Sequence, residues 1–142
     1  MGKVMSKVTI TNQYDRWNVE QGTLQADRVR TVTLEALVDT GATTLALPAD
    51  VVAALGLPEI NRRRVRMANG AVEELAVVGG FMLEILGRTG MCEAFVLPAG
   101  TTPLIGQVPL EILDLIVDPK SREVTVNPAS PDAPLLDLLR AS

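Results

Sequence analysis

The segment ALVDTGATTLAL, residues 36–47, places an acid, a hydroxyl and a glycine between two apolar runs. The apolar flanks predict that the turn at Asp39 lies inside the fold, where an ionised carboxylate is costly unless it is hydrogen-bonded or paired. Gly41 permits close approach of the backbone, and Thr40 can brace the turn through its hydroxyl. Taken alone, Asp-Thr-Gly also fits an ordinary turn in which Asp39 accepts hydrogen bonds from nearby amides. The flanks favour a carboxylate with a chemical role.

The rest of the sequence narrows the chemistry that Asp39 can take part in. There is no histidine, which excludes Ser-His-Asp catalysis and the common zinc sites. Cys92 is the only cysteine, so no intrachain disulfide can form, and we expect it to be a small core residue in a reducing compartment. The glycine pairs at 79–80 and 87–90 lack the strand-loop-helix context of a phosphate loop. The sequence therefore predicts no metal and no cofactor.

Composition indicates one globular domain with an aliphatic core. The chain has 142 residues, of which 47% are hydrophobic, 21% charged and 3% aromatic, so Val, Leu, Ile, Ala and Met must fill the core. The net charge of −4 argues against a nucleic-acid-binding surface. The four arginines at 62, 63, 64 and 66 are interpreted as a solvated strand or loop, with contact to substrate or a polyanion as the alternative. No apolar run is long enough for a membrane span or a signal peptide, which predicts a cytoplasmic protein without membrane contact.

The elements that position Asp39 are mostly strands. Alternation predicts strands at 4–10 and 29–38, with a strand end and a turn closing at Gly22 between them. Pro48 and Gly56 delimit a short helix. Asn69-Gly70 predicts a hairpin turn between strands at 62–67 and 73–78. The remaining expected elements are a second hairpin (81–86 and 91–97, turning at 87–90), a helical turn from Pro109 to Leu113, strands at 115–118 and 123–126, and one apolar helical turn at 135–139.

One pattern occurs twice along the chain. Leu37-Val38 precedes Asp39 and a helix that starts near proline; Leu104-Ile105 precedes Gly106 and a second such helix. Together with the Asn69-Gly70 hairpin, ALVDTGATTLALP and PLIGQVPLEIL resemble the retropepsin-like aspartic proteases over about residues 29–127. The resemblance implies an all-β fold, the closed barrel of the acid proteases, with one or two short helices. It also implies a domain at 1–127 followed by a tail at 128–142.

The resemblance implies a homodimeric aspartic endopeptidase that cuts peptides or proteins. Two carboxylates in contact share one proton, so that one activates water while the other polarises the carbonyl. The chain has a single Asp-Thr-Gly, so Asp39 of each subunit would meet across a two-fold axis. The roles implied for the other residues are an active-site loop (Thr40, Gly41, Ala42), substrate contacts (Gly41, Thr43, Asn69, Gly70), a flap at the Asn69-Gly70 hairpin, a hydrogen bond from Thr40 across the dimer, and structural support of the loop (Leu104, Ile105, Gly106).

The sequence departs from retroviral members in several places. Thr43 and Thr44 stand where many of those members have acids, the flap tip has one glycine, and residues 128–142 do not look like an interleaved interface strand. The pattern is more similar to small bacterial retropepsin-like proteins. Two alternatives remain open: a non-catalytic dimerisation or peptide-binding module on the same fold, and an unrelated small β-barrel in which Asp39 only forms a turn.

Overall fold

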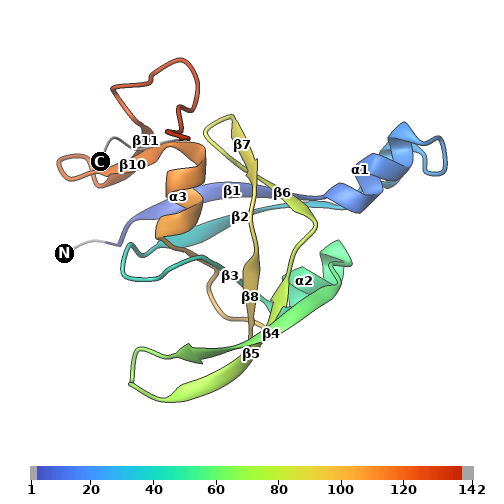
Figure 1. Cartoon of the computed structure of the whole chain (residues 1–142), viewed down its shortest axis with the longest axis horizontal. Helices are drawn as coiled ribbons and strands as arrows, with labels where there is room; N and C mark the ends of the chain where they lie inside the picture. The colour runs from blue at the N-terminus through green and yellow to red at the C-terminus, as the bar shows by residue number, and fades with distance from the viewer. Residues whose placement is uncertain (1–2, 139–142) are drawn as a thin grey trace.

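The computed structural model describes residues 3–138 and shows a mostly β protein with three short helices (Figure 1). The all-β class is confirmed, with one more helix than expected. The strands are β1 (Met5–Asn12), β2 (Thr31–Val38), β3 (Leu45–Pro48), β4 (Glu59–Arg66), β5 (Val72–Val78), β6 (Phe81–Ile85), β7 (Arg88–Met91), β8 (Ala94–Leu97), β9 (Leu104–Ile105), β10 (Leu115–Asp118) and β11 (Glu123–Val126). The helices are α1 (Gln13–Glu20), α2 (Ala49–Leu55) and α3 (Gln107–Leu113), with a 3-10 turn at Ala26–Arg28.

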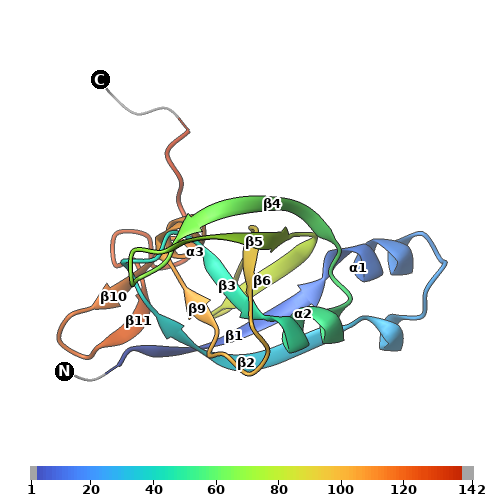
Figure 2. The ribbon, with the colours of Figure 1, turned by 90° about the horizontal axis from the view of Figure 1, so that it is seen from below.

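Nine strands form one curled sheet in the order β4-β5-β8-β3-β9-β2-β1-β6-β7, and β10 and β11 form a separate hairpin. In Figure 2 the sheet curls so that β4 and β5 lie across from β1 and β2. The short strand β9 lies between β2, to which it is parallel, and β3, to which it is antiparallel. The two repeats of the sequence pattern therefore meet in the middle of the sheet.

The core lies inside the curl and is aliphatic apart from Phe81. Along β2 the side chains of Ala36 and Val38 are buried. On the opposite face, the hydroxyl groups of Thr31 and Thr33 form hydrogen bonds with threonine hydroxyl groups of β1. This alternation is the one that the sequence predicted for a half-buried strand. The expected contribution of methionine is wrong for the described residues, because no methionine is among the buried core residues and Met5 and Met91 are exposed.

Residues 13–20 form helix α1, where the sequence predicted a strand end and a turn. Asn12 ends β1 and caps the helix, because its side-chain oxygen accepts a hydrogen bond from the amide of Asp15 at 3.0 Å. The Asp15 carboxylate in turn accepts from the backbone amide and guanidinium of Arg30, and these hydrogen bonds lower the pKa of Asp15. Local capping and one ion pair therefore form a helix whose weak apolar pattern did not predict it.

The second hairpin also differs from the expectation. Its turn is Leu86-Gly87, both at positive φ (53° and 78°), so the return strand β7 already starts at Arg88. Residues 94–97 form a separate strand, β8, which pairs with β3 and β5. The first hairpin, β4–β5 with its turn at Asn69-Gly70, and the capping of α2 by Gly56 at φ 64° are as predicted.

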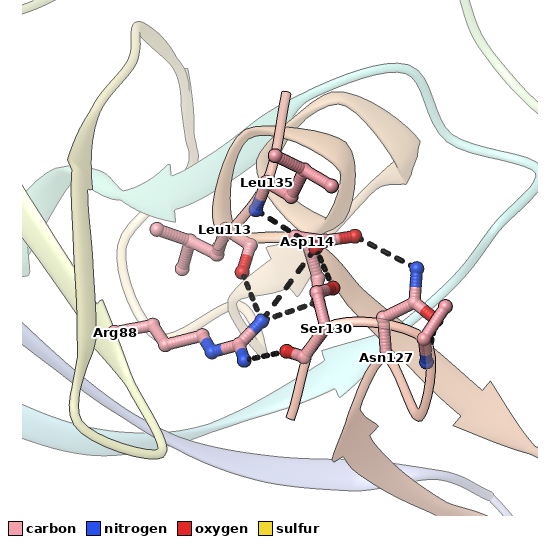
Figure 3. A network of polar contacts seen from close by, with 7 residues as sticks. Arg88, Leu113, Asp114, Asn127, Ser130 and Leu135 are labelled. Carbon is pink, nitrogen blue, oxygen red and sulfur yellow. Dashed lines mark hydrogen bonds and ion pairs between the residues drawn. The ribbon is translucent and has the colours of Figure 1, made fainter. Parts of the chain in front are cut away.

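A polar network at the end of α3 anchors the start of the C-terminal tail (Figure 3). Asp114 ends α3 at φ 54°, and its carboxylate accepts hydrogen bonds from Asn127, Ser130 and the backbone amide of Leu135. The buried Arg88 donates to the carbonyls of Leu113, Asp114 and Ser130. The expected helical turn at 135–139 is wrong for residues 135–138, which have no helical structure, and residue 139 lies outside the described part of the chain.

Candidate active site

The loop that carries Asp39 leaves the end of β2 and is held in place by β9 and the start of α3. The backbone amide of Asp39 donates to the carbonyl of Ile105 at 2.9 Å, which continues the parallel β2–β9 pairing past Val38. The amides of Gly106, Gln107 and Val108 donate to the carbonyls of Thr44, Ala42 and Thr43 at 3.0, 2.9 and 2.8 Å. The loop is therefore fixed by hydrogen bonds from a segment more than sixty residues away in the sequence.

Gly106 makes this close contact feasible. A Cβ atom at position 106 would lie 2.6 Å from the carbonyl oxygen of Thr44 and 2.7 Å from that of Ala42. Both are backbone atoms, so they cannot rotate away as a side chain would. Its φ of −91° is accessible to any residue, so it is the lack of a side chain that this position requires.

The Asp39 carboxyl group is oriented by its own turn and is open to solvent in the single chain. Its Oδ1 accepts a hydrogen bond from the amide of Gly41 at 2.9 Å, and its carbonyl accepts from Ala42 at 3.0 Å. The predicted burial of the turn is wrong for one chain on its own, because Asp39, Thr40 and Gly41 are exposed while Val38 and Leu45 beside them are buried. The apolar flanks therefore anchor the loop in the core and leave its acid on the surface.

A cavity of about 350 Å³ lies between the Asp39 loop and the β4–β5 hairpin. The loop contributes Asp39, Gly41, Ala42, Thr43 and Thr44. The hairpin contributes Val65, Arg66, Met67, Ala68 and Leu75, and the floor is formed by Ala46, Phe95, Leu97 and Leu104. An acid at the edge of a mostly apolar cavity beneath a hairpin suits the binding of an extended chain with apolar side chains.

Of the four residues expected to contact the substrate, two line the cavity beside Asp39 and two do not. Gly41 and Thr43 line the cavity, whereas Asn69 and Gly70 form the hairpin turn and do not line it. The side chain of Asn69 accepts from the amide of Ala71 at 2.9 Å, which stabilises the turn itself. Met67 and Ala68, just before the turn, are the residues of this hairpin end that face the cavity.

Sequence reasoning did not single out Leu75, Phe95 or Leu97 as cavity residues. Each lies in a strand whose alternation predicted only a buried or half-buried face. Their part in the cavity depends on the pairing of β8 with both β3 and β5, a long-range arrangement that local patterns do not encode. Leu104, expected only to support the loop, also lines the cavity.

Other candidate chemistry is sparse in the described part of the chain. Between residues 3 and 138, no three Cys, Asp or Glu side chains cluster in a way that could hold a metal ion. Burial, and to a lesser degree the charge of Glu93, raises the pKa of the Cys92 thiol to about 12, as suits a packing residue. No helix within residues 3–138 has the length and apolar character needed to cross a membrane.

Comparison with protein families gives a match over the region of the site. The family model described as "gag-polyprotein putative aspartyl protease" matches residues 25–111. The matched region contains β2, the Asp39 loop, the β4–β5 hairpin, β9 and most of α3, and it covers more than half of the chain. A search of curated proteins found no match. With the half-barrel sheet and the anchored Asp-Thr-Gly loop described above, this match shows that the chain belongs to the gag-polyprotein aspartyl protease family, the retropepsin-like group that its motifs resemble.

Proposed function

We propose that the protein is a homodimeric aspartic endopeptidase in which Asp39 of each subunit forms the catalytic pair. The observation that carries the proposal is the Asp39 loop itself. Its backbone is fixed by β9 and α3, its carboxyl group is exposed, and it borders a cavity beneath the β4–β5 hairpin. A second copy of the same loop would supply the second carboxylate that one chain lacks.

Peptide hydrolysis by this pair needs both protonation states at once. The ionised Asp39 takes a proton from water as the water oxygen attacks the scissile carbonyl carbon, and the protonated Asp39 of the other subunit donates its proton to the carbonyl oxygen. When the tetrahedral intermediate collapses, a proton passes to the leaving amide nitrogen and the carbon–nitrogen bond breaks. Two carboxylates in contact cannot both ionise, so a pair holding a single proton is the stable form over a broad acidic-to-neutral range.

The remaining loop and hairpin residues take supporting roles in this proposal. Thr40, exposed in the single chain, hydrogen-bonds to the partner loop, and Gly41 and Thr43 contact the substrate backbone. The hairpin that ends in Asn69-Gly70 closes over the bound peptide, with Met67 and Ala68 facing it. Gly70, at φ 86°, supplies the positive backbone angle that the tip requires.

The test is cleavage of a mixed peptide library by the wild type and by Asp39→Asn between about pH 4 and pH 7, the range in which a shared-proton pair works. We expect cleavage by the wild type and none by the variant, with both proteins dimeric by mass in solution. Equal cleavage by both would contradict the proposal. Peptide binding without cleavage by a dimeric wild type would instead identify a non-catalytic binding module.

A further inference from the structure

A second cavity, of about 570 Å³, continues the groove away from Asp39 along β4. It shares part of its wall with the cavity beside Asp39, namely Thr43, Thr44, Val65, Arg66 and Phe95. Its other apolar walls come from Val77, Cys92, Ala94, Val108 and Ile112. A chain lying beneath the hairpin would therefore pass directly from one cavity into the other.

The basic residues of β4 are divided between two faces of the hairpin. Successive side chains of a strand point to opposite faces, so Arg63 and Val65 share one face and Arg62 and Arg64 share the other. Val65 lines both cavities and is half-buried, which identifies the face of Arg63 as the inner one. On β5 the inner face carries Leu75, the residue that pairs with Arg63.

Arg62 and Arg63 differ in how their charges are balanced. Arg62 is paired with Glu59 and Glu74, both at 2.8 Å, and does not line the cavity. Arg63 lines the cavity, and within residues 3–138 no carboxylate lies within ion-pair distance of it. Glu93 is the one acid among the cavity residues and forms no ion pair with an arginine in the same described range. The second cavity thus combines an apolar floor with positive charge from Arg63, which has no ion-pair partner among residues 3–138. Arg64 and Arg66, whose Cβ atoms alternation puts on the face of Arg62, also line this cavity.

Resting on the proposed protease function, we infer that this cavity is a substrate subsite that selects an acidic side chain through Arg63. The methylene groups of a glutamate suit the apolar floor, and its carboxylate suits a guanidinium at the edge. Arg63 precedes Met67, which borders the cavity of Asp39, by four strand positions, or about 13 Å at the usual rise of about 3.3 Å per residue. With the scissile bond placed in the cavity that Asp39 and Met67 share, an extended substrate covers that length with about four residues, so the acidic residue lies three or four positions from the bond that is cut.

The experiment compares matched peptides that differ only in Glu or Gln, which have the same shape but not the same charge. Starting from a sequence that the enzyme cuts, Glu and Gln are placed in turn at three and four positions on either side of the scissile bond. We expect kcat/KM to favour Glu about tenfold at one of these positions in the wild type, as a charge-assisted hydrogen bond would give. In Arg63→Gln the preference should fall to about one, whereas Arg62→Gln, whose side chain faces away, should retain it.

Two results would overturn the inference. The first is cleavage without any preference for Glu, or with a preference that survives Arg63→Gln. The second is an equal loss in Arg62→Gln and Arg63→Gln, which would indicate a general attraction of anions, including polyanions, by the basic hairpin.

A binding measurement separates this inference from the protease proposal. Fluorescence anisotropy with the Asp39→Asn protein compares the same Glu and Gln peptides without any turnover. Tighter binding of the Glu peptide that is lost when Arg63→Gln is added supports the subsite, even if the wild type cuts nothing. Equal binding of both peptides rejects the subsite and leaves the outcome for hydrolysis unaffected.

Discussion

At the scale of single residues, Gly106 is central to the position of the Asp39 loop. Its amide donates a hydrogen bond to the carbonyl of Thr44. Two backbone carbonyl oxygens approach Gly106 so closely that a Cβ atom at this position would clash with them. The sequence singled out this glycine through the repeated pattern of two apolar residues and a glycine. The backbone contact that explains it is visible only once β9 lies between β2 and β3.

Substituting Gly106→Ala is therefore expected to impair catalysis more than folding. Relief of contacts at 2.6–2.7 Å must shift the loop backbone by several tenths of an ångström. Because misplacement of a catalytic group by about 1 Å costs on the order of 100-fold in rate, we expect kcat/KM to fall at least about tenfold. The measurement is peptide cleavage together with thermal unfolding. Gly79→Ala is the control, since its Cβ would meet only the flexible end of Ile60; an unchanged rate in Gly106→Ala would contradict the role given to this glycine.

The most specific expectation drawn from the sequence concerned the chemistry of Asp39. The setting of Asp39 between apolar runs, together with the absence of histidine, pointed to chemistry by a carboxylate. What failed was the predicted burial of the turn, because apolar flanks can anchor a loop without covering it. Whether Asp39 is exposed depends on which strands lie next to its loop, and the strand order of the sheet is set by pairing between segments far apart in the sequence.

At the scale of elements, the end of α3 and the start of the tail form one unit around Asp114. The hydroxyl of Ser130, then the amide of Asn127 and the backbone amide of Leu135, lower the pKa of the Asp114 carboxyl to about 2, and the charge of Arg88 adds to this. The sequence predicted a helical turn that ends at Leu113, next to Asp114, and separated residues 128–142 as a tail. It did not predict that the hydroxyl of Ser130 and the backbone amide of Leu135 donate hydrogen bonds to the Asp114 carboxylate.

This network gives a pH dependence with a definite sign. A carboxyl group whose pKa is lower in the folded than in the unfolded state stabilises the fold at pH values above the pKa of the unfolded state, here near 3.8. That contribution is lost as the pH falls toward the pKa of the folded state, about 2. We expect Asp114→Asn to be less stable than the wild type by a constant margin from pH 7 to about pH 4, and the margin to shrink between about pH 4 and pH 2. Urea unfolding at a series of pH values measures the margin. The exposed Asp27→Asn should show little difference at any of these values, and a margin for Asp114→Asn that grows in acid would refute the assignment.

Element prediction succeeded where a local signal fixed the structure and failed where two signals competed. Gly70 and Gly56 are at positive φ (86° and 64°), a backbone conformation that few residues other than glycine adopt, so the hairpin and the end of α2 followed from the sequence. Helix α1 was missed because its capping by Asn12 and its ion pair with Arg30 outweigh a weak apolar pattern. The turn at Leu86-Gly87 was missed because leucine at positive φ is not a turn signal.

At the scale of the whole molecule, one chain contains half of the proposed catalytic apparatus. The nine-stranded sheet is continuous from β4 to β7, and the exposed Asp39 loop lies at its middle, between β2 and β3. The general fold was predictable because motif order, hairpin signals and alternation agree over most of the chain. The crossing of β9 between β2 and β3, and the wrapping of β4 and β5 over the site, arise from pairings that no local pattern specifies.

A shared active site makes a quantitative prediction for mixed subunits. If each active unit needs Asp39 from both chains, then exchange of wild type with an equal amount of Asp39→Asn leaves about a quarter of the dimers with two carboxylates, whereas independent sites would leave about half of the activity per total chain. Cleavage is measured after subunit exchange, at constant total protein. Asp27→Asn, the same chemical change at an exposed position away from the loop, should not reduce activity in the same mixture. Residual cleavage activity near a quarter of the wild-type value requires that two Asp39 residues act as a pair. Residual activity near half would mean that each chain works alone, which the geometry of a single exposed carboxylate does not support.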